Sequence, residues 1–532
     1  MNLKNILELT DKAIANNNYE YAISVIEKEL KLNPNIFELN FKLGLLYNIS
    51  GDLKKAINFY QKTTLLNPNY SPAYCNLGII HDKLDDRSSA IKYYKTAIEK
   101  DSKNFKAYFN LANCYLNNDD LKNAEKYYYL SINIKHDNIH SYINLFQIYD
   151  RSNDLKKLDE ILQKAQNIFS KNPVVLFFEA ISEYRKSNYH KSINIFEKLE
   201  LDPRDMSKNV TKYNTLAKCY DHLGMFDKAF KSFKISNTIT HDAFEKKVDK
   251  KKYIKLIEKR FNYFSQTTFK NFSNKITEDQ NIDPIFLVGF PRSGTTLLDT
   301  ILRTHSSIEV LEEKPTVDKL IKQLHVYTNN NFTNLNKLDQ NITQKLRSLY
   351  FETREKFVSH KSDKIYIDKL PLNIVYIGEL IKIFPNSKFI LSLRNPYDSV
   401  MSCFMQPFIP NDAMANFYNL SDACKLYDQV FRLWTQYEEK LDIKFYKIKY
   451  EEIVENFETS ILNLLKFLNL EWDNKLKEFY KTAENRGIIN TPSYNQINKP
   501  LYTNSIGRWK NYKKYFEKLD PILKKWNSKF GY

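Results

Sequence analysis

A repeat with a period near 34 residues runs from the start of the chain to about residue 240, and it constrains the fold more than any other feature of the sequence. Two series of small residues keep the interval, namely Gly44, Gly78 and Ala112, and Ala22, Ala56, Ala90 and Ala124. Small side chains at a fixed period are needed where two helices of a unit cross closely. The sequence therefore predicts an all-α solenoid of about seven helix pairs over residues 1–240.

Aromatic residues and prolines follow the same period. Tyr60, Tyr94 and Tyr128 recur beside the small residues, and Pro34 and Pro68 mark the ends of units. The pattern resembles tetratricopeptide repeats. That resemblance implies a curved solenoid whose concave face binds a protein or peptide. Plain helical packing without a ligand would leave the same pattern.

Composition excludes several classes of protein. The 532 residues carry a net charge of +17, but no dense basic run alternates with aromatics as in nucleic-acid-binding proteins. No apolar run is long enough to span a bilayer, and the N-terminus lacks the apolar core of a secretory signal. The five cysteines form no Cys-x-x-Cys pair, which argues against zinc and a disulfide framework. We expect a cytoplasmic protein.

The pattern changes after the repeats. Residues 241–282 are charged and aromatic and read as a helical connector, whereas residues 283–532 alternate short apolar strands with helices. That alternation predicts an α/β domain with a parallel sheet and a ligand site at the strand ends. Its first unit, from Pro284 to Leu302, reads as a buried strand, a loop rich in Gly, Pro and hydroxyls, and a helix.

The loop of this first unit predicts an anion site. Backbone N–H groups and the positive end of a helix would face one point there. The residues that we expect to bind the anion are Pro291, Arg292, Ser293, Gly294, Thr295 and Thr296. Gly289 and Gly294 have the spacing of a nucleotide P-loop, but Thr295 replaces its lysine, which disfavours a kinase or NTPase.

The loop sequence Pro-Arg-Ser-Gly-Thr-Thr resembles the 5′-phosphosulfate loop of sulfotransferases that use 3′-phosphoadenosine 5′-phosphosulfate (PAPS). A second segment carries the same resemblance, because Arg394 at a strand end is followed eight residues later by Ser402. In the family, an Arg and a Ser at this spacing hold the 3′-phosphate, and Arg suits the task because its planar fork donates two hydrogen bonds. Tyr450 and Arg508 resemble further nucleotide contacts.

The resemblance also implies the catalytic residues. A Glu that lies 21 positions after the loop Arg acts as the base in tyrosylprotein sulfotransferases and in bacterial relatives with repeats; here Glu313 holds that position after Arg292. Glu312 is the second candidate. Lys369 matches the lysine that contacts the transferred group, and Ser493 the serine near the bridging oxygen. Each could otherwise be an ordinary surface residue.

With these features the sequence resembles a tetratricopeptide-repeat sulfotransferase. The resemblance implies transfer of a sulfuryl group from PAPS to an acceptor hydroxyl without a metal. A protein tyrosine presented with help from the repeats is the first candidate acceptor, and a carbohydrate, lipid or small metabolite stays open. The alternative is a repeat-based interaction scaffold whose transferase domain binds nucleotide but is inactive. The sequence does not indicate the oligomeric state.

Overall fold

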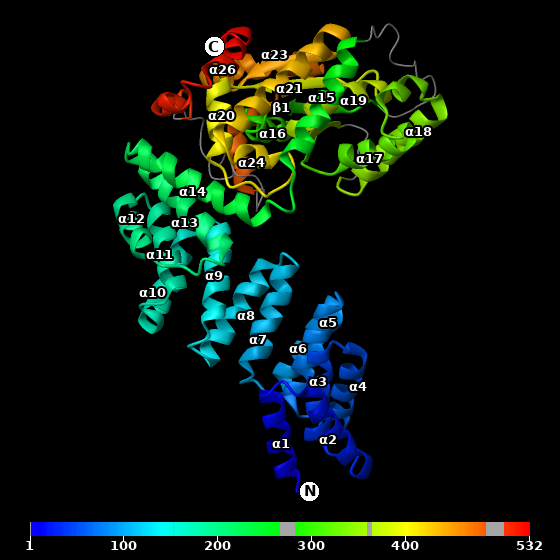
Figure 1. Cartoon of the computed structure of the whole chain (residues 1–532), viewed down its shortest axis with the longest axis vertical. Coiled ribbons are helices and arrows are strands. Elements are labelled where there is room, and N and C mark those ends of the chain that lie inside the picture. Colours follow the sequence, from blue (N-terminus) through cyan, green and yellow to red (C-terminus); the bar gives the residue numbers. More distant parts are fainter. Residues whose placement is uncertain (1, 153, 267–281, 359–363, 486–504) are drawn as a thin grey trace. The chain divides into compact units, whose positions relative to one another are not determined.

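The computed structural model describes residues 2–152, 154–266, 282–358, 364–485 and 505–532 (Figure 1). The chain divides into two compact units, Met1–Leu199 and Glu200–Tyr532. This division falls inside the range predicted to be the repeat array, residues 1–240. The sequence places domain limits at residues 240 and 282 from where its patterns change. These limits stay a prediction.

The first unit is all-helical, as the repeat predicts. Its helices are α1 (Leu3–Ala15), α2 (Tyr19–Leu32), α3 (Phe37–Ser50), α4 (Leu53–Leu66), α5 (Ser71–Lys83), α6 (Arg87–Lys100), α7 (Phe105–Asn117), α8 (Leu121–Ile134), α9 (Ile139–Arg151), α10 (Leu155–Phe169), α11 (Pro173–Arg185) and α12 (Tyr189–Lys198). Successive helices pack as antiparallel pairs, which is clearest for α3 with α4 and for α5 with α6 (Figure 1).

The small residues lie where the helices of a pair cross. A Cβ added to Gly78 would stand 2.5 Å from Cε1 of Tyr94, and one added to Gly44 would stand 2.6 Å from Cδ1 of Tyr60. The aromatic ring of one helix thus fills the space that the glycine of the other leaves. This contact explains why both residue types share one period.

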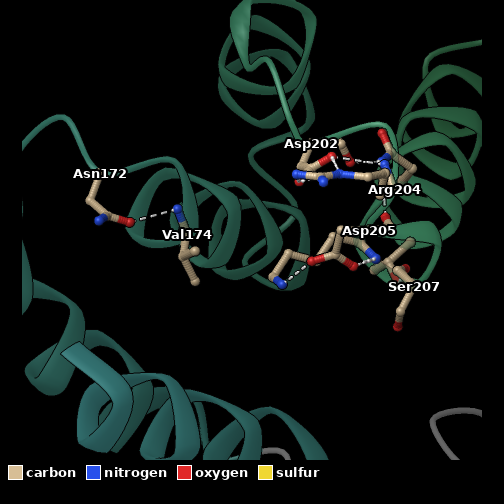
Figure 2. Close-up of polar contacts among 9 residues, drawn as sticks. Asn172, Val174, Asp202, Arg204, Asp205 and Ser207 are labelled. Carbon is tan, nitrogen blue, oxygen red and sulfur yellow. Dashed lines mark hydrogen bonds and ion pairs between the residues drawn. The ribbon is translucent and has the colours of Figure 1, made fainter. Parts of the chain in front are cut away.

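Helix starts in both units are capped by side chains that accept hydrogen bonds from the first turn. In the first unit, Asn172 Oδ1 accepts from the N–H of Val174 at 2.9 Å and so caps α11 (Figure 2). In the second, Asp205 accepts from the N–H of Lys208 at 3.1 Å at the start of α13. Such caps satisfy N–H groups that have no partner within the helix.

The second unit begins with a helix hairpin and continues as an α/β domain. Its helices are α13 (Met206–His222), α14 (Phe226–Phe244), α15 (Lys250–Gln266), α16 (Thr295–Thr304), α17 (Thr316–Thr328), α18 (Gln340–Glu355), α19 (Ile377–Ile383), α20 (Pro396–Phe404), α21 (Leu420–Lys440), α22 (Tyr450–Glu455), α23 (Phe457–Leu468), α24 (Phe479–Asn485) and α26 (Asp520–Lys529). Short 3₁₀ helices are η1 (Phe332–Lys337), η2 (Pro371–Tyr376), η3 (Met414–Phe417), η4 (Asn474–Glu478) and η5 (Arg508–Tyr515).

A parallel sheet forms the centre of this unit. Its strands are β1 (Ile285–Gly289), β2 (Ile308–Glu312), β3 (Ile365–Lys369), β4 (Lys388–Leu393) and β5 (Lys444–Lys449), in the order β2-β3-β1-β4-β5. All pairings among these strands are parallel. The predicted fold class, a helical repeat solenoid followed by an α/β domain with a parallel sheet, is therefore confirmed.

The two faces of the sheet are both buried, as a parallel sheet requires. On one face, Leu287, Ile367 and Ile390 join a core cluster with side chains of α16, α22 and α23. On the other, Phe286 stacks on Phe389 with ring centroids 5.5 Å apart. Side chains thus cover both faces, and in sheets of this kind ligands bind beyond the carboxyl ends of the strands.

Helix α15, which lies in the predicted connector, packs firmly into the second unit. Arg260 forms an ion pair of 2.6 Å with Glu379, and both side chains are almost wholly buried. The ring of Phe264 fills the space above Gly378, where a Cβ would stand 2.1 Å from its Cζ. In the part of the chain that the structure describes, no helix is both long and apolar enough to cross a membrane.

Candidate anion-binding and catalytic site

The residues that the sequence singles out gather at the carboxyl edge of the sheet. The loop that starts at Phe290 follows β1, Lys369 ends β3, Arg394 follows β4, and Tyr450 follows β5. Parallel strands bring their carboxyl ends to one edge, so these side chains share one side of the domain.

The loop between β1 and α16 is a tight turn. Arg292 has φ 66° and Gly294 has φ 93°, so two positions adopt the left-handed region. A Cβ on Gly289 would stand 2.5 Å from the carbonyl oxygen of Ser392 on the neighbouring strand. A Cβ on Gly294 would stand 2.8 Å from the Tyr450 ring. Glycine is required at both places, which fixes how closely the loop approaches β4 and Tyr450.

The predicted 3′-phosphate residues lie against this loop. Arg292 Nε donates to Ser402 Oγ at 3.0 Å, so the loop Arg and the serine of α20 are in contact. Arg394 donates to the carbonyl oxygen of Arg292 at 3.2 Å, and its guanidinium lies 5.0 Å from the centre of the Tyr450 ring. The structure thus brings together four residues from three separate parts of the sequence.

Two buried polar atoms at the loop have no hydrogen-bond partner among the described residues. They are Ser293 Oγ and Arg394 Nε. A buried donor without a partner is costly, and such groups are rare unless a ligand or water satisfies them. Gly294 is the N-cap residue of α16 and makes no side-chain hydrogen bond. The N–H groups of Thr295 and Thr296 at the helix start therefore have no capping side chain from this position. The donor set fits an oxyanion such as phosphate or sulfate.

A segment near the end of the chain closes over Arg394. Tyr450 Oη and Ser505 Oγ are 2.7 Å apart, and Arg394 also donates to the carbonyl oxygen of Ser505. The N–H groups of Gly507 and Trp509 donate to Asp398 at 2.7 and 2.9 Å. Asp398 lies one turn before Ser402 on α20, so a single helix presents both residues.

The structure does not confirm the roles predicted for the remaining two site residues, Arg508 and Ser493. Arg508 forms an ion pair of 2.6 Å with Asp221 of α13, and its assignment to the 3′-phosphate stays a prediction. Ser493 lies outside the described residues, so the structure does not test its role.

The predicted catalytic groups form a cluster at the ends of β2 and β3. Lys369 Nζ lies 3.0 Å from Glu313 Oε1 and 3.2 Å from Glu312 Oε1, and the N–H of Glu313 donates to the carbonyl oxygen of Lys369 at 2.9 Å. Burial alone would lower the pKa of Lys369, but the carboxylates of Glu313, Glu312 and Asp299 outweigh it and raise that pKa. Lys369 therefore stays cationic at neutral pH.

Within the residues that the structure describes, no group of three or more His, Cys, Asp or Glu side chains could hold a metal ion.

Residues 284–474 match the sulfotransferase family, and residues 37–70, 71–104 and 93–126 match the tetratricopeptide repeat. The sulfotransferase match contains the loop, Glu313, Lys369, Arg394, Ser402 and Tyr450. The chain thus combines tetratricopeptide repeats with a sulfotransferase-family domain. Residues 284–474 form its sulfotransferase region.

Several relatives support this assignment, although their identity is low and each matches only part of the chain. An uncharacterized protein of Aquifex aeolicus is 26% identical over 56% of this chain and 39% of its own length. Protein-tyrosine sulfotransferase 1 of Danio rerio is 24% identical over 46% of this chain and 70% of its own length, and protein-tyrosine sulfotransferase 2 of Gallus gallus is 23% identical over 42% and 62%. The chain thus spans only part of the relatives that it matches.

Among solved structures, the crystal structure of MamA is 27% identical over 30% of this chain and 95% of its own, with a TM-score of 0.28. That score is too low to support a conclusion about this chain.

Three residues of the sulfotransferase region and its surroundings were missed from the sequence. Asp398 could have been suspected, because it precedes Ser402 by one helical turn and shares its face. Ser505 gave no local signal, since its role depends on contacts with Tyr450 and Arg394. Asp368 is buried beside Lys369 and accepts hydrogen bonds from the hydroxyls of Thr316 and Tyr350. Burial raises the pKa of Asp368 to about 6, although these two hydrogen bonds by themselves would lower it.

Proposed function

We propose that this protein transfers a sulfuryl group from PAPS to an acceptor hydroxyl, with a protein tyrosine as the first candidate acceptor. The observation that carries the proposal is the pair of Glu313 and Lys369, which are 3.0 Å apart at the carboxyl edge of the sheet that also bears the anion loop. A carboxylate and a buried cation side by side supply what sulfuryl transfer to a hydroxyl needs: a proton acceptor and a fixed positive charge.

The chemistry of the loop supports PAPS as the donor. Arg292, Ser293 and the N–H groups at the start of α16 suit the 5′-phosphosulfate. Arg394 and Ser402 suit a second phosphate, which distinguishes PAPS from ATP because only PAPS carries a 3′-phosphate. The partnerless Ser293 Oγ and Arg394 Nε, both among the described residues, support both assignments.

In the proposed step, the acceptor oxygen attacks sulfur while Glu313 takes its proton. A new oxygen–sulfur bond forms, the bond from sulfur to the bridging phosphate oxygen breaks, and adenosine 3′,5′-bisphosphate leaves with the electron pair. Arg292 and Lys369 offset the charge that develops on the transferred group and the leaving oxygen, and Ser493 is proposed to assist at that oxygen. The Glu313 side chain is 43% exposed, so an acceptor hydroxyl can reach it.

The acceptor proposal is supported by the relatives named protein-tyrosine sulfotransferase and by the repeats, which suit a polypeptide partner. We propose that the repeats bind a protein or peptide, with the acceptor itself as one candidate. We also propose a cytoplasmic location, which is supported by the buried thiols of Cys75, Cys114, Cys403 and Cys424.

The test is calorimetric titration of the full chain with adenosine 3′,5′-bisphosphate and, separately, with ATP. We expect tight binding of the bisphosphate, weak binding of ATP, and loss of bisphosphate binding in Arg394→Ala. Arg432→Ala is the matched control, because Arg432 is exposed on α21 and stacks on Phe261. Equal binding of ATP and the bisphosphate would contradict the donor assignment.

Transfer is then measured with radiolabelled PAPS on tyrosine peptides, with serine peptides and sugars as comparison acceptors. Label on tyrosine supports the full proposal, and label on another hydroxyl class corrects the acceptor. Bisphosphate binding without transfer to any acceptor would favour the scaffold alternative.

A further inference from the structure

The helix hairpin α13–α14 caps the helix that carries Ser402. The side-chain amide of Asn214 donates to the carbonyl oxygen of Met405 at 3.0 Å, and that of Asn237 donates to the carbonyl oxygen of Phe404 at 2.9 Å. Both amides are buried. The last carbonyl groups of a helix have no partner within it, so these two bonds complete the C-terminal end of α20. The hairpin therefore fixes the C-terminal end of α20, within one helical turn of Ser402.

The same hairpin also holds the segment that closes over Arg394. Asp221 of α13 accepts from Arg508 at 2.6 Å and from the hydroxyl of Tyr512. Phe230 of α14 stacks on Tyr515 with ring centroids 3.6 Å apart. Asp221 thus bonds at once to Arg508, next to the anion site, and to Tyr512 farther along the chain.

The held segment reaches directly into the anion site. Asp398 accepts from the N–H groups of Gly507 and Trp509, which flank Arg508 on either side. Two residues before Gly507, Ser505 contacts Tyr450 and Arg394 through its hydroxyl and carbonyl groups. The backbone from Ser505 to Trp509 is thus held between an aspartate of α20 and an aspartate of α13.

We propose that Asp221 is a positioning residue for the 3′-phosphate end of the nucleotide site. Through Arg508 and Tyr512 it sets the segment of residues 505–509, so that Ser505 and Arg394 stand ready for the phosphate. The inference rests on the proposed function, because it takes Arg394 and Ser402 as the 3′-phosphate residues. It adds a role for a helix that the sequence assigns to the repeats.

The direction of the effect separates this role from its opposite. If Asp221 positions the segment, its removal weakens nucleotide binding. If Asp221 instead competes with phosphate for Arg508, its removal leaves Arg508 available and tightens binding. The short contacts to both Arg508 and Tyr512, together with the anchoring of Gly507 and Trp509 by Asp398, favour positioning.

The experiment compares two ligands on the full chain by calorimetry: adenosine 3′,5′-bisphosphate and adenosine 5′-monophosphate. For Asp221→Asn we expect the Kd of the bisphosphate to rise about tenfold or more, the size of effect expected when a charge-assisted hydrogen bond is lost. We expect the Kd of the monophosphate, which lacks the 3′-phosphate, to stay unchanged. Asp221→Glu keeps the carboxylate and should fall between Asp221→Asn and the unaltered chain.

Asp227→Asn is the matched control, because Asp227 lies on the same hairpin but bonds to Tyr515 and Lys514, beyond the segment of residues 505–509. It should leave both dissociation constants unchanged. Thermal unfolding of each variant detects a general loss of structure, which would weaken the binding of both ligands alike. In that case Tyr512→Phe, which removes one hydroxyl, provides the milder test. It should still weaken the binding of the bisphosphate selectively.

The outcomes are distinct. Selective weakening of the bisphosphate supports the inference. Unchanged or tighter bisphosphate binding in Asp221→Asn overturns it and leaves the proposed function intact. Failure of the unaltered chain to bind the bisphosphate would overturn the proposed function itself.

Discussion

Glu312 and Glu313 both bond to Lys369, yet they differ in exposure, with side chains 17% and 43% exposed. Because an acceptor hydroxyl must reach the base, the more exposed Glu313 fits that role better. For Glu313→Gln we predict a fall in sulfuryl transfer of about 10²- to 10⁴-fold, the usual contribution of a positioned general base. Binding of adenosine 3′,5′-bisphosphate should be unchanged, since the amide keeps the size of the side chain.

The control for this prediction is Glu309→Gln. Glu309 lies on β2, the strand that ends just before Glu313, but it bonds to Lys364 near the start of β3, away from the carboxyl edge. Its loss should leave the rate unchanged. Full turnover of Glu313→Gln would move the base assignment to Glu312.

Asp368 should make folding stability depend on pH. Its pKa rises on folding from an ordinary value of 3.8 to about 6, because burial disfavours the charged form. A group with a raised pKa in the folded state stabilises below its unfolded pKa and loses that contribution as pH rises through the folded pKa. The contribution should therefore decline between about pH 4 and 6, by about 3 kcal/mol at 1.36 kcal/mol per pH unit.

Urea unfolding of the unaltered chain and of Asp368→Asn across pH 4 to 7 checks this prediction. Asn cannot ionise, so the stability of the variant relative to the unaltered chain should improve as pH rises over that window and then stay level. A stability difference that is flat with pH would show that Asp368 does not titrate there.

At the scale of elements, local sequence predicted the repeat helices and the strands that lead to the anion loop, Lys369 and Arg394, but not the strand order. The strand before Gly289 and the strand ending at Lys369 were recognisable because a short apolar run followed by a turn is a local pattern. The roles expected of Arg292 and Ser402 came from the family resemblance, and the direct contact between them was not predicted. The links from Asp398 to Gly507 and from Ser505 to Tyr450 were not predictable, because each depends on chain folding over a long separation.

The helix crossings of the repeats allow a prediction at this scale. Alanine normally stabilises a helix relative to glycine by about 1 kcal/mol. In Gly78→Ala the new Cβ would stand 2.5 Å from the Tyr94 ring, so we predict a loss of about 1–3 kcal/mol from overpacking instead. Midpoints of urea unfolding measure the change.

Tyr94→Leu tests the cause of that loss. It removes the ring atoms that face Gly78, so the double variant should be less destabilised than the two single changes added together. Strict additivity would mean that the ring and the added methyl group do not interact.

At the scale of the whole molecule, the repeat pattern and the packing divide the chain at different places. The small residues Ala217, Gly224 and Ala229 continue the repeat through α13 and α14. In the structure these helices belong to the compact unit Glu200–Tyr532, where they cap α20 and hold Arg508. A repeat pattern records how two helices pack against each other, and it carries no information about what their other faces contact.

Deletion at two points should reveal which division matters for function. A chain of residues 200–532 keeps α13 and α14, so we predict that it binds adenosine 3′,5′-bisphosphate as the full chain does. A chain of residues 245–532 lacks the hairpin, which exposes the Phe404 and Met405 carbonyl groups and frees Arg508 from Asp221. We predict that its affinity falls on the order of tenfold or more, because several buried hydrogen bonds are lost together.

Circular dichroism should accompany the titrations of the two shortened chains. If residues 245–532 keep their helical signal and bind the bisphosphate less tightly, the hairpin acts on the site. If they lose their fold, the hairpin is part of the domain's core, and the boundary again lies before α13. Equal affinity of both shortened chains would contradict the prediction, and it would place the working boundary of the transferase at the end of the repeat pattern near residue 240.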